Sequence, residues 1–145
     1  MIKKYNIIII LLLSISFTVN ALSENDFFTE AKKNFNEKKY NDSKFLFQRN
    51  IVFNPKDENS YLYLAKIFNI EENEREKEKN INTVLLLNPK NEEAISILME
   101  IELKKSNYSK VRELIENFTK VCIKLCDNKN SILQSLKNLE PKNES

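Results

Sequence analysis

One segment of this 145-residue chain repeats at a fixed spacing: residues 54–58 (NPKDE) recur as residues 88–92 (NPKNE), 34 positions later. A period of this length is typical of helical hairpins, each of which buries its apolar face only against a neighbouring hairpin. The repeat therefore predicts an all-α solenoid. The same shift superposes further sets, most of which keep one chemical character: Phe27, Tyr61 and Ile95; Ala31, Ala65 and Met99; Phe35, Asn69 and Leu103; Phe47, Ile81 and Ile115.

The first unit has the pattern of two amphipathic helices. Phe27, Ala31 and Phe35 recur at four-residue spacing, which predicts a helix over about residues 24–38. A second helix is expected to begin at Tyr40 and to end before Pro55, whose ring disfavours helical geometry at the preceding residue. The side chains predicted to lie on its buried face are Phe45, Phe47, Ile51 and Phe53.

The second and third units follow the same scheme but end differently. The second closes at Pro89, whereas the third has Ile123 where proline would recur, so its last helix is expected to run on to about Leu125. One more amphipathic helix, over about 130–140, is predicted to cap the apolar end of the stack. Residues 141–145 are expected to fray. The apolar residues of the capping helix are Ile132, Leu133, Leu136 and Leu139.

In its interlocking small and bulky residues, the chain resembles the tetratricopeptide-repeat family over about residues 24–123. The matching positions are Ala31 and Ala65 in the first helices, Tyr40 and Tyr108 at the turns, Ser43 and Val111 in the second helices, and Pro55 and Pro89 at the unit ends. The resemblance implies a right-handed α-α superhelix of three hairpins plus a C-terminal capping helix. The domain would span residues 22–140, with repeats at about 24–57, 58–91 and 92–125.

Some positions depart from the family pattern. Met99 replaces a small residue, and Lys77 and Asn50 stand where the family favours alanine, which predicts looser helix packing around the last two. The turns carry Lys38, Glu72 and Ser106 in place of glycine.

The resemblance also implies a concave groove, lined by the first helices, that binds a peptide or a partner helix. In this groove apolar side chains would anchor a ligand and Lys32 and Lys66 would meet carboxylates. Alternatively, Phe28 and Phe35 belong to the ordinary core. By alignment, the groove presents Phe28, Lys32, Phe35, Asn36, Asn59, Leu62, Lys66, Asn69, Ile70, Glu93, Ser96, Glu100, Leu103 and Lys104.

The carboxylate clamp that some family members use to grip acidic chaperone tails is not present. Its Lys and Asn positions hold Phe28, Lys32, Tyr63, Glu93 and Ile97 in this chain.

The amino terminus has the pattern of a secretory signal peptide over residues 1–21. Lys3 and Lys4 precede an apolar run from Ile7 to Leu13, and a small residue, Ala21, ends the segment. The mature chain would begin near Leu22 and be periplasmic or secreted. An uncleaved membrane anchor is the alternative, although the apolar run is shorter than the ~20 residues that a spanning helix needs.

Charge and composition exclude several classes of function. Residues 1–21 hold two of the 23 basic residues and none of the 21 acidic ones, so the remainder has no net charge and offers no basic footprint for nucleic acid. The chain contains no His and no Gly, which removes the commonest general base and argues against nucleotide-binding loops. We therefore expect no enzymatic activity, no cofactor and no metal.

Cys122 and Cys126 are the two cysteines of the chain. In an exported protein they are candidates for a disulfide, which would be strained in a regular helix and would fit best if the helix unwinds near Leu125. Two buried thiols are the alternative.

These observations predict an exported, non-enzymatic interaction module that binds a segment of another envelope protein and serves as adaptor, assembly factor or holding chaperone. The alternative is a structural protein that dimerises through its C-terminal helices and buries Leu133 and Leu136 against a second copy.

Overall fold

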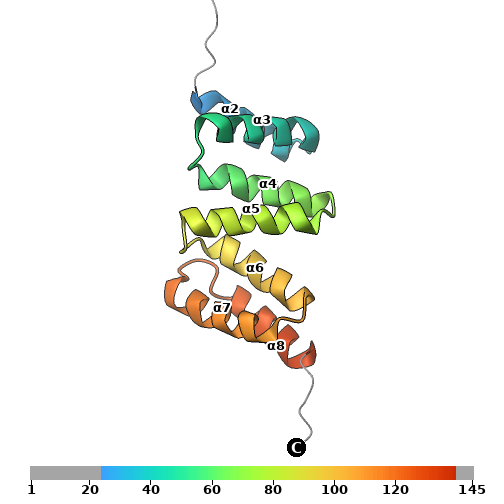
Figure 1. Ribbon diagram of the computed structural model, residues 1–145, viewed down its shortest axis with the longest axis vertical. Coiled ribbons are helices and arrows are strands. Elements are labelled where there is room, and N and C mark those ends of the chain that lie inside the picture. Colours follow the sequence, from blue (N-terminus) through green and yellow to red (C-terminus); the bar gives the residue numbers. More distant parts are fainter. Residues whose placement is uncertain (1–23, 140–145) are drawn as a thin grey trace, which may run out of the picture.

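A computed structural model describes the chain from residue 24 to residue 139 (Figure 1). The predicted signal peptide, the expected new amino terminus at Leu22 and the tail at 141–145 lie outside these residues. Within them the structure is helical and contains no strand, which confirms the all-α prediction. The helices are α2 (Glu24–Asn36), α3 (Tyr40–Phe53), α4 (Glu58–Ile70), α5 (Glu74–Leu87), α6 (Glu92–Lys104), α7 (Tyr108–Val121) and α8 (Asn128–Leu139).

The helices form three hairpins and a final cap, as the repeat predicts. Helices α2 and α3, α4 and α5, and α6 and α7 pair through short turns, and each hairpin packs on the next. Figure 1 shows the resulting elongated stack, with α2 and α3 at one end and α8 at the other. None of the helices in the described part of the chain has the length and apolar character needed to span a membrane.

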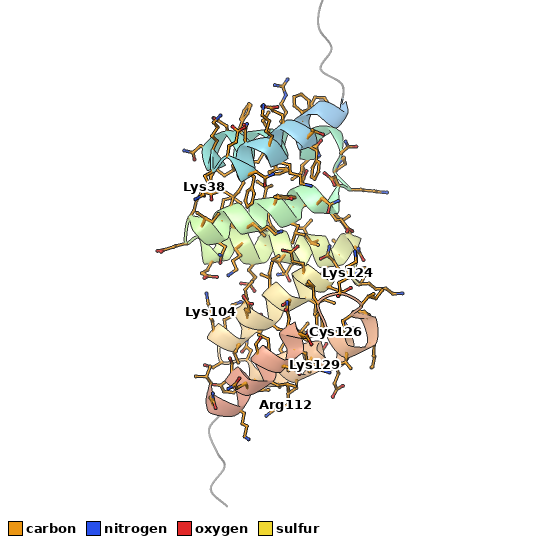
Figure 2. All side chains as sticks on the ribbon, turned by 180° about the vertical axis from the view of Figure 1, so that it is seen from behind. Lys38, Lys104, Arg112, Lys124, Cys126 and Lys129 are labelled. Atoms are coloured by element: carbon orange, nitrogen blue, oxygen red, sulfur yellow. A yellow bond between two sulfur atoms is a disulfide. The ribbon has the colours of Figure 1, made fainter. Side chains whose placement is uncertain are left out.

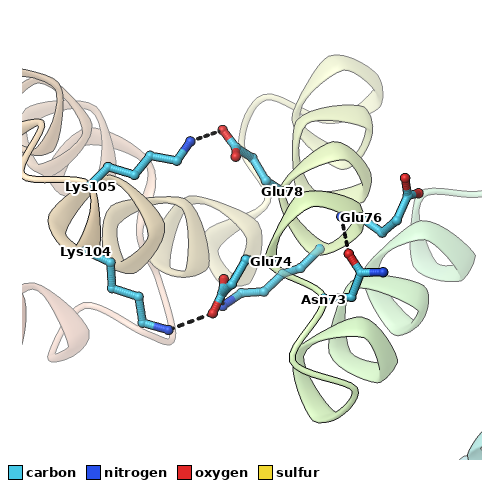
Figure 3. Close-up of polar contacts among 7 residues, drawn as sticks. Asn73, Glu74, Glu76, Glu78, Lys104 and Lys105 are labelled. Atoms are coloured by element: carbon cyan, nitrogen blue, oxygen red, sulfur yellow. Dashed lines mark hydrogen bonds and ion pairs between the residues drawn. The ribbon is translucent and has the colours of Figure 1, made fainter.

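Local signals at the unit junctions set where helices begin and end. Asp57 and Asn91, one repeat apart, are the N-cap residues of α4 and α6, and their side chains accept hydrogen bonds from Asn59 N and Ala94 N at 3.2 and 2.9 Å. Such caps satisfy amide groups that have no partner inside the helix. Asn73 caps α5 in the same way, by accepting from Glu76 N (Figure 3).

The buried face of α3 differs from the prediction. Phe45 and Phe53 are 60% and 55% exposed, whereas Ser43, Phe47 and Asn50 are buried. Buried residues at i, i+4 and i+7 define one helix face, and Phe45 lies about 200° around the helix from it. The Ser43 hydroxyl donates to the Ala31 carbonyl at 2.9 Å, so this small polar residue lets α3 lie close to α2.

Two apolar clusters meet at α4. Leu64 and Ile67 belong to a cluster shared with the first unit, whereas Leu62 and Ala65 belong to the larger cluster of the second and third units and α8. Since α4 contributes to both, the two clusters are parts of one continuous stack.

Asn50 and Lys77, the two departures from alanine, are both buried and both have polar partners. The Asn50 amide group donates to Asp57 and Ser60 at 2.7 and 2.9 Å, and the Lys77 ammonium group pairs with Glu74. Each of these buried polar side chains therefore has a hydrogen-bond or ion-pair partner.

The three hairpin turns place a residue other than glycine in the left-handed region. The φ angles of Lys38, Glu72 and Ser106 are 61°, 56° and 60°. Lys38 is labelled at the α2–α3 turn in Figure 2. These are the positions at which the resemblance expects glycine, because only glycine adopts this conformation without steric cost.

Replacing these residues with glycine is expected to stabilise the protein. Lys38→Gly and Ser106→Gly should each raise the free energy of unfolding by up to about 1 kcal/mol, because relief of the left-handed strain exceeds the entropy that glycine adds to the unfolded chain. Chemical denaturation measures the effect. Lys39→Gly is the matched control, since Lys39 has a φ of −83° and its replacement should destabilise. A loss of stability in both test variants would contradict the argument.

Helix α7 ends at Val121, about one turn earlier than the predicted Leu125. Cys122 has extended geometry and is joined to Cys126 by a disulfide, with Cα atoms 5.3 Å apart. The chain leaves the helix because Glu92 at the start of α6 accepts hydrogen bonds from the backbone amides of Lys124 and Leu125 at 2.9 and 2.8 Å. Figure 2 shows Lys124 and Cys126 in the resulting α7–α8 loop.

The bonds to Glu92 make this loop sensitive to acid. The Leu125 amide, with a smaller contribution from Lys124, holds the pKa of the Glu92 carboxyl below its ordinary 4.5. A carboxylate with a lowered pKa stabilises the folded state above that ordinary value and loses this contribution as the pH falls through the lowered pKa.

We expect hydrogen-exchange protection of the Lys124 and Leu125 amides to be high at neutral pH and to fall in acid, once intrinsic exchange rates are divided out. Glu92→Ala should show low protection at every pH. Protection in the wild type that does not change between neutral pH and acid would contradict a role for the carboxylate.

Helix α8 caps the stack, over Asn128–Leu139. Ile132 and Leu136 are buried in the core cluster that contains α6 and α7 residues, and the Tyr108 hydroxyl donates to the Leu139 carbonyl at 3.0 Å. The prediction that Leu136 packs against a second copy is therefore wrong, because its own chain already covers it. Leu133 and Leu139 remain 42% and 57% exposed.

Candidate functional site

A pocket of about 250 Å³ opens between the first helices of the three units. It combines residues of α2, α4 and α6 with one side chain from α5. Five of the residues predicted for the groove lie together in its wall, namely Phe35, Lys66, Asn69, Ile70 and Glu100. We call this cavity the groove pocket, and its lining is Phe35, Ala65, Lys66, Asn69, Ile70, Lys77, Ile97 and Glu100.

The other predicted groove residues lie outside this pocket. Lys32, Asn36 and Asn59 are exposed, and Phe28, Glu93 and Leu103 are half-buried. Leu62 differs from the prediction, because only 6% of its side chain is exposed and it belongs to the core of the second and third units. It is therefore not available as an anchor for a ligand.

Aromatic rings form the part of the groove next to the first unit. The ring of Tyr63 stacks on Phe47 with centroids 5.0 Å apart and meets Phe35 and Phe28 edge-on at 5.1 and 6.0 Å. Such aromatic pairs stabilise the folded state beyond what the burial of their apolar surface contributes. Phe28 and Phe35 thus pack against the core, which is the alternative predicted for them from the sequence. Phe35 also lines the groove pocket.

Lys66 is held at the rim by two contacts. Its ammonium group lies 2.7 Å from a Glu93 carboxylate oxygen and 4.9 Å from the centre of the Tyr63 ring. Both members of the ion pair are partly exposed, so the pair orients the side chain and contributes under about 1 kcal/mol to stability.

Lys77 reaches the groove pocket from the second helix of its unit. Its side chain is 4% exposed, and its ammonium group pairs with Glu74 at 3.1 Å. Glu74 also pairs with Lys104 at 2.9 Å, which Figure 3 shows beside the Glu78–Lys105 pair. The hydrogen bond from Lys104 and then that from Lys77 hold the pKa of Glu74 below its ordinary value, so the carboxylate stays charged beside the buried lysine.

The alignment identified Lys77 only as a departure, yet the sequence carries a signal for its burial. Lys77 precedes Ile81 and Val84 by four and seven residues, so helical periodicity puts it on the same buried face. Ile97 was recognised as a position of the missing clamp and was not predicted to line a pocket.

The chemistry of the groove pocket suits binding. Its floor is apolar, with Phe35, Ala65 and Ile97, and its rim carries amide, ammonium and carboxylate groups. Residues 27–139 contain no group of three or more His, Cys, Asp or Glu side chains placed to hold a metal ion. A concave apolar floor with a few polar groups at the edge is typical of ligand-binding sites.

Substitution of Lys77 separates its packing from its charge. Lys77→Met keeps most of the buried volume and removes a desolvated charge, so it should change the free energy of unfolding by less than about 1 kcal/mol or raise it. Lys77→Ala empties the space and should cost about 2–3 kcal/mol. Urea denaturation measures both. If methionine destabilises as much as alanine, the ion pair with Glu74 and not the packing is what the site requires.

No family model matches the sequence, and no curated protein matches it. Solved structures do resemble it. The type III secretion chaperone SycD of Yersinia enterocolitica, in complex with a peptide of the translocator YopD, has a TM-score of 0.70 at 15% identity, covering 85% of this chain and 97% of SycD.

Two further solved structures show the same likeness. The first tetratricopeptide repeat of Spaghetti (RPAP3), bound to the HSP90 peptide SRMEEVD, has a TM-score of 0.68 at 13% identity, covering 80% of this chain and 94% of its own. The Sgt2 domain of Aspergillus fumigatus has a TM-score of 0.64 at 14% identity, with 79% and 77% covered. The chain therefore has the tetratricopeptide-repeat fold.

Proposed function

We propose that this protein is a non-enzymatic interaction module that binds a peptide segment or helix of another protein in the groove of its first helices. The groove pocket carries this proposal. Three successive first helices contribute to it, and Ile70 stands at its wall with 46% of its surface exposed. An apolar side chain of a partner would bury against Ile70, Phe35 and Ile97 and would thereby remove exposed apolar surface from water.

Two structures of similar fold support a peptide ligand. SycD was solved with a peptide of YopD, and the Spaghetti repeat domain with a peptide of HSP90. At this level of identity they supply a precedent for the use of the fold, and the residues of the groove pocket supply the argument for this chain.

The amino-terminal segment supports export as part of the proposal. Residues 1–21 have the charge and apolar pattern of a signal peptide, and the Cys122–Cys126 disulfide suits an oxidising compartment. The protein would then act in the cell envelope or outside the cell, as adaptor, assembly factor or holding chaperone for an exported partner.

Crosslinking in cells tests the proposal. Wild-type protein is expected in the exported fraction, crosslinked to a partner, and Ile70→Asp should reduce recovery of that partner at least about tenfold, because it places a charge in the apolar wall. Leu86→Asp is the matched control, since Leu86 is 82% exposed on α5 and is not part of the pocket. Quantitative mass spectrometry measures recovery, and circular dichroism checks the fold. Equal recovery with both variants would refute the groove as the binding site.

A further inference from the structure

Lys32 and Lys66 occupy equivalent positions of the repeat, but within the described part of the chain only Lys66 has a carboxylate partner. Lys66 pairs with Glu93 of the next unit. The residue equivalent to Glu93 in the second unit is Asn59, so the acid that would neutralise Lys32 is missing. The residues three and four positions from Lys32 on α2 carry no negative charge either. Among the described residues, Lys32 makes no ion pair and is exposed.

Glu100 occupies the position of the third unit that is equivalent to Lys32 and Lys66, and its charge is negative where theirs is positive. Its side chain is exposed and lies in the wall of the groove pocket. Lys104, one helical turn further on, directs its ammonium group to Glu74 at 2.9 Å instead. Over residues 27–139, Glu100 therefore has no ion-pair partner within 4 Å. The groove thus has a positive side chain on α2 and a negative one on α6.

The groove pocket, which is lined by Glu100 and by Phe35 about one helical turn from Lys32 on α2, favours an uncharged side chain. Both of its lysines are already paired, Lys66 with Glu93 and Lys77 with Glu74. Phe35, Ile70 and Ile97 supply apolar surface, and the volume of about 250 Å³ admits a side chain of the size of leucine. An acidic side chain here would lose its hydration without gaining a free partner, whereas Glu100 in the pocket wall is left to face a basic residue beside the anchor.

We infer that the groove selects segments in which an apolar anchor residue is flanked by an acidic residue on one side and a basic residue on the other. The anchor enters the groove pocket, the acidic residue faces Lys32 and the basic residue faces Glu100. The inference rests on the proposed function and adds the chemistry of the ligand. Charges at the rim of a binding site act mainly on selectivity and association rate, and salt screens them. Each mismatched charge is expected to weaken binding about three- to fivefold at low salt.

Synthetic peptides with a central leucine test this selectivity. Each peptide carries one residue on either side of the leucine, separated from it by serine spacers of graded length. These two flanking residues are one Asp and one Lys in either chain order, two Asp, two Lys, or two Ser. Fluorescence anisotropy measures affinity for the mature protein. Wild type should prefer the peptides with one Asp and one Lys and lose this preference in high salt.

Charge-exchange variants sharpen the test. Lys32→Glu leaves two negative charges in the groove and should prefer the peptide with two Lys. Glu100→Lys leaves two positive charges and should prefer the peptide with two Asp. The double variant should regain the preference for one charge of each sign. Lys120→Glu, an exposed charge on α7, is the control and should leave the ranking unchanged.

The outcomes separate this inference from the proposed function. If all peptides bind wild type equally, or if Lys32→Glu and Glu100→Lys do not alter the ranking, the charge selectivity is refuted while leucine binding that Ile70→Asp abolishes still supports the groove. If no peptide binds, the anchor and its flanking charges are both refuted. Partner recovery in cells then decides the proposed function independently.

Discussion

Helix α4 holds the molecule together, because it is the one helix of the described chain whose buried residues divide between both apolar clusters. Leu64 and Ile67 pack toward the first unit, whereas Leu62 and Ala65 pack toward the second and third. Neither hairpin on its own could remove these side chains from water. The groove pocket lies over the same helix, with Lys66, Asn69 and Ile70 in its wall. The site is thus built on an element that burial fixes from two sides, which is what a preformed binding surface requires.

The hairpins could be predicted because their signals are local. Pro55 and Pro89 end helices, and Asp57 and Asn91 begin the next, within a few residues of each other. The end of α7 could not be predicted in this way, because the amides of Lys124 and Leu125 bind Glu92, more than thirty residues earlier in the chain. The prediction that Phe45 and Phe53 are buried rests on their apolar character alone, and it is wrong because Ser43, Phe47 and Asn50 form the face of α3 toward α2 and α4.

The candidate site was predictable to the extent that it follows the repeat. The repeat register predicts five residues of the groove that the structure brings to one pocket, namely Phe35, Lys66, Asn69, Ile70 and Glu100. It could not show that Lys77 crosses from α5 into the same pocket, since that depends on how much room the first helices leave between them. The prediction that Leu62 lines the groove is wrong, because packing against the third unit buries it in the larger cluster. A repeat predicts which residues share a row, and packing between units decides which of them reach a ligand.

Ion pairs across the unit boundaries show how units that resemble each other keep their order. Lys44 on α3 pairs with Glu71 at the next hairpin turn, and the equivalent pair one repeat later is Glu78 with Lys105, with the charges reversed (Figure 3). As partly exposed pairs they add under about 1 kcal/mol each to stability. If the first unit were to pack directly on the third, however, Lys44 would face Lys105, and like charges would oppose each other. Burial of apolar surface does not distinguish between neighbouring units of similar shape. The alternation of charge does, and it therefore favours the native order of the units over other orders.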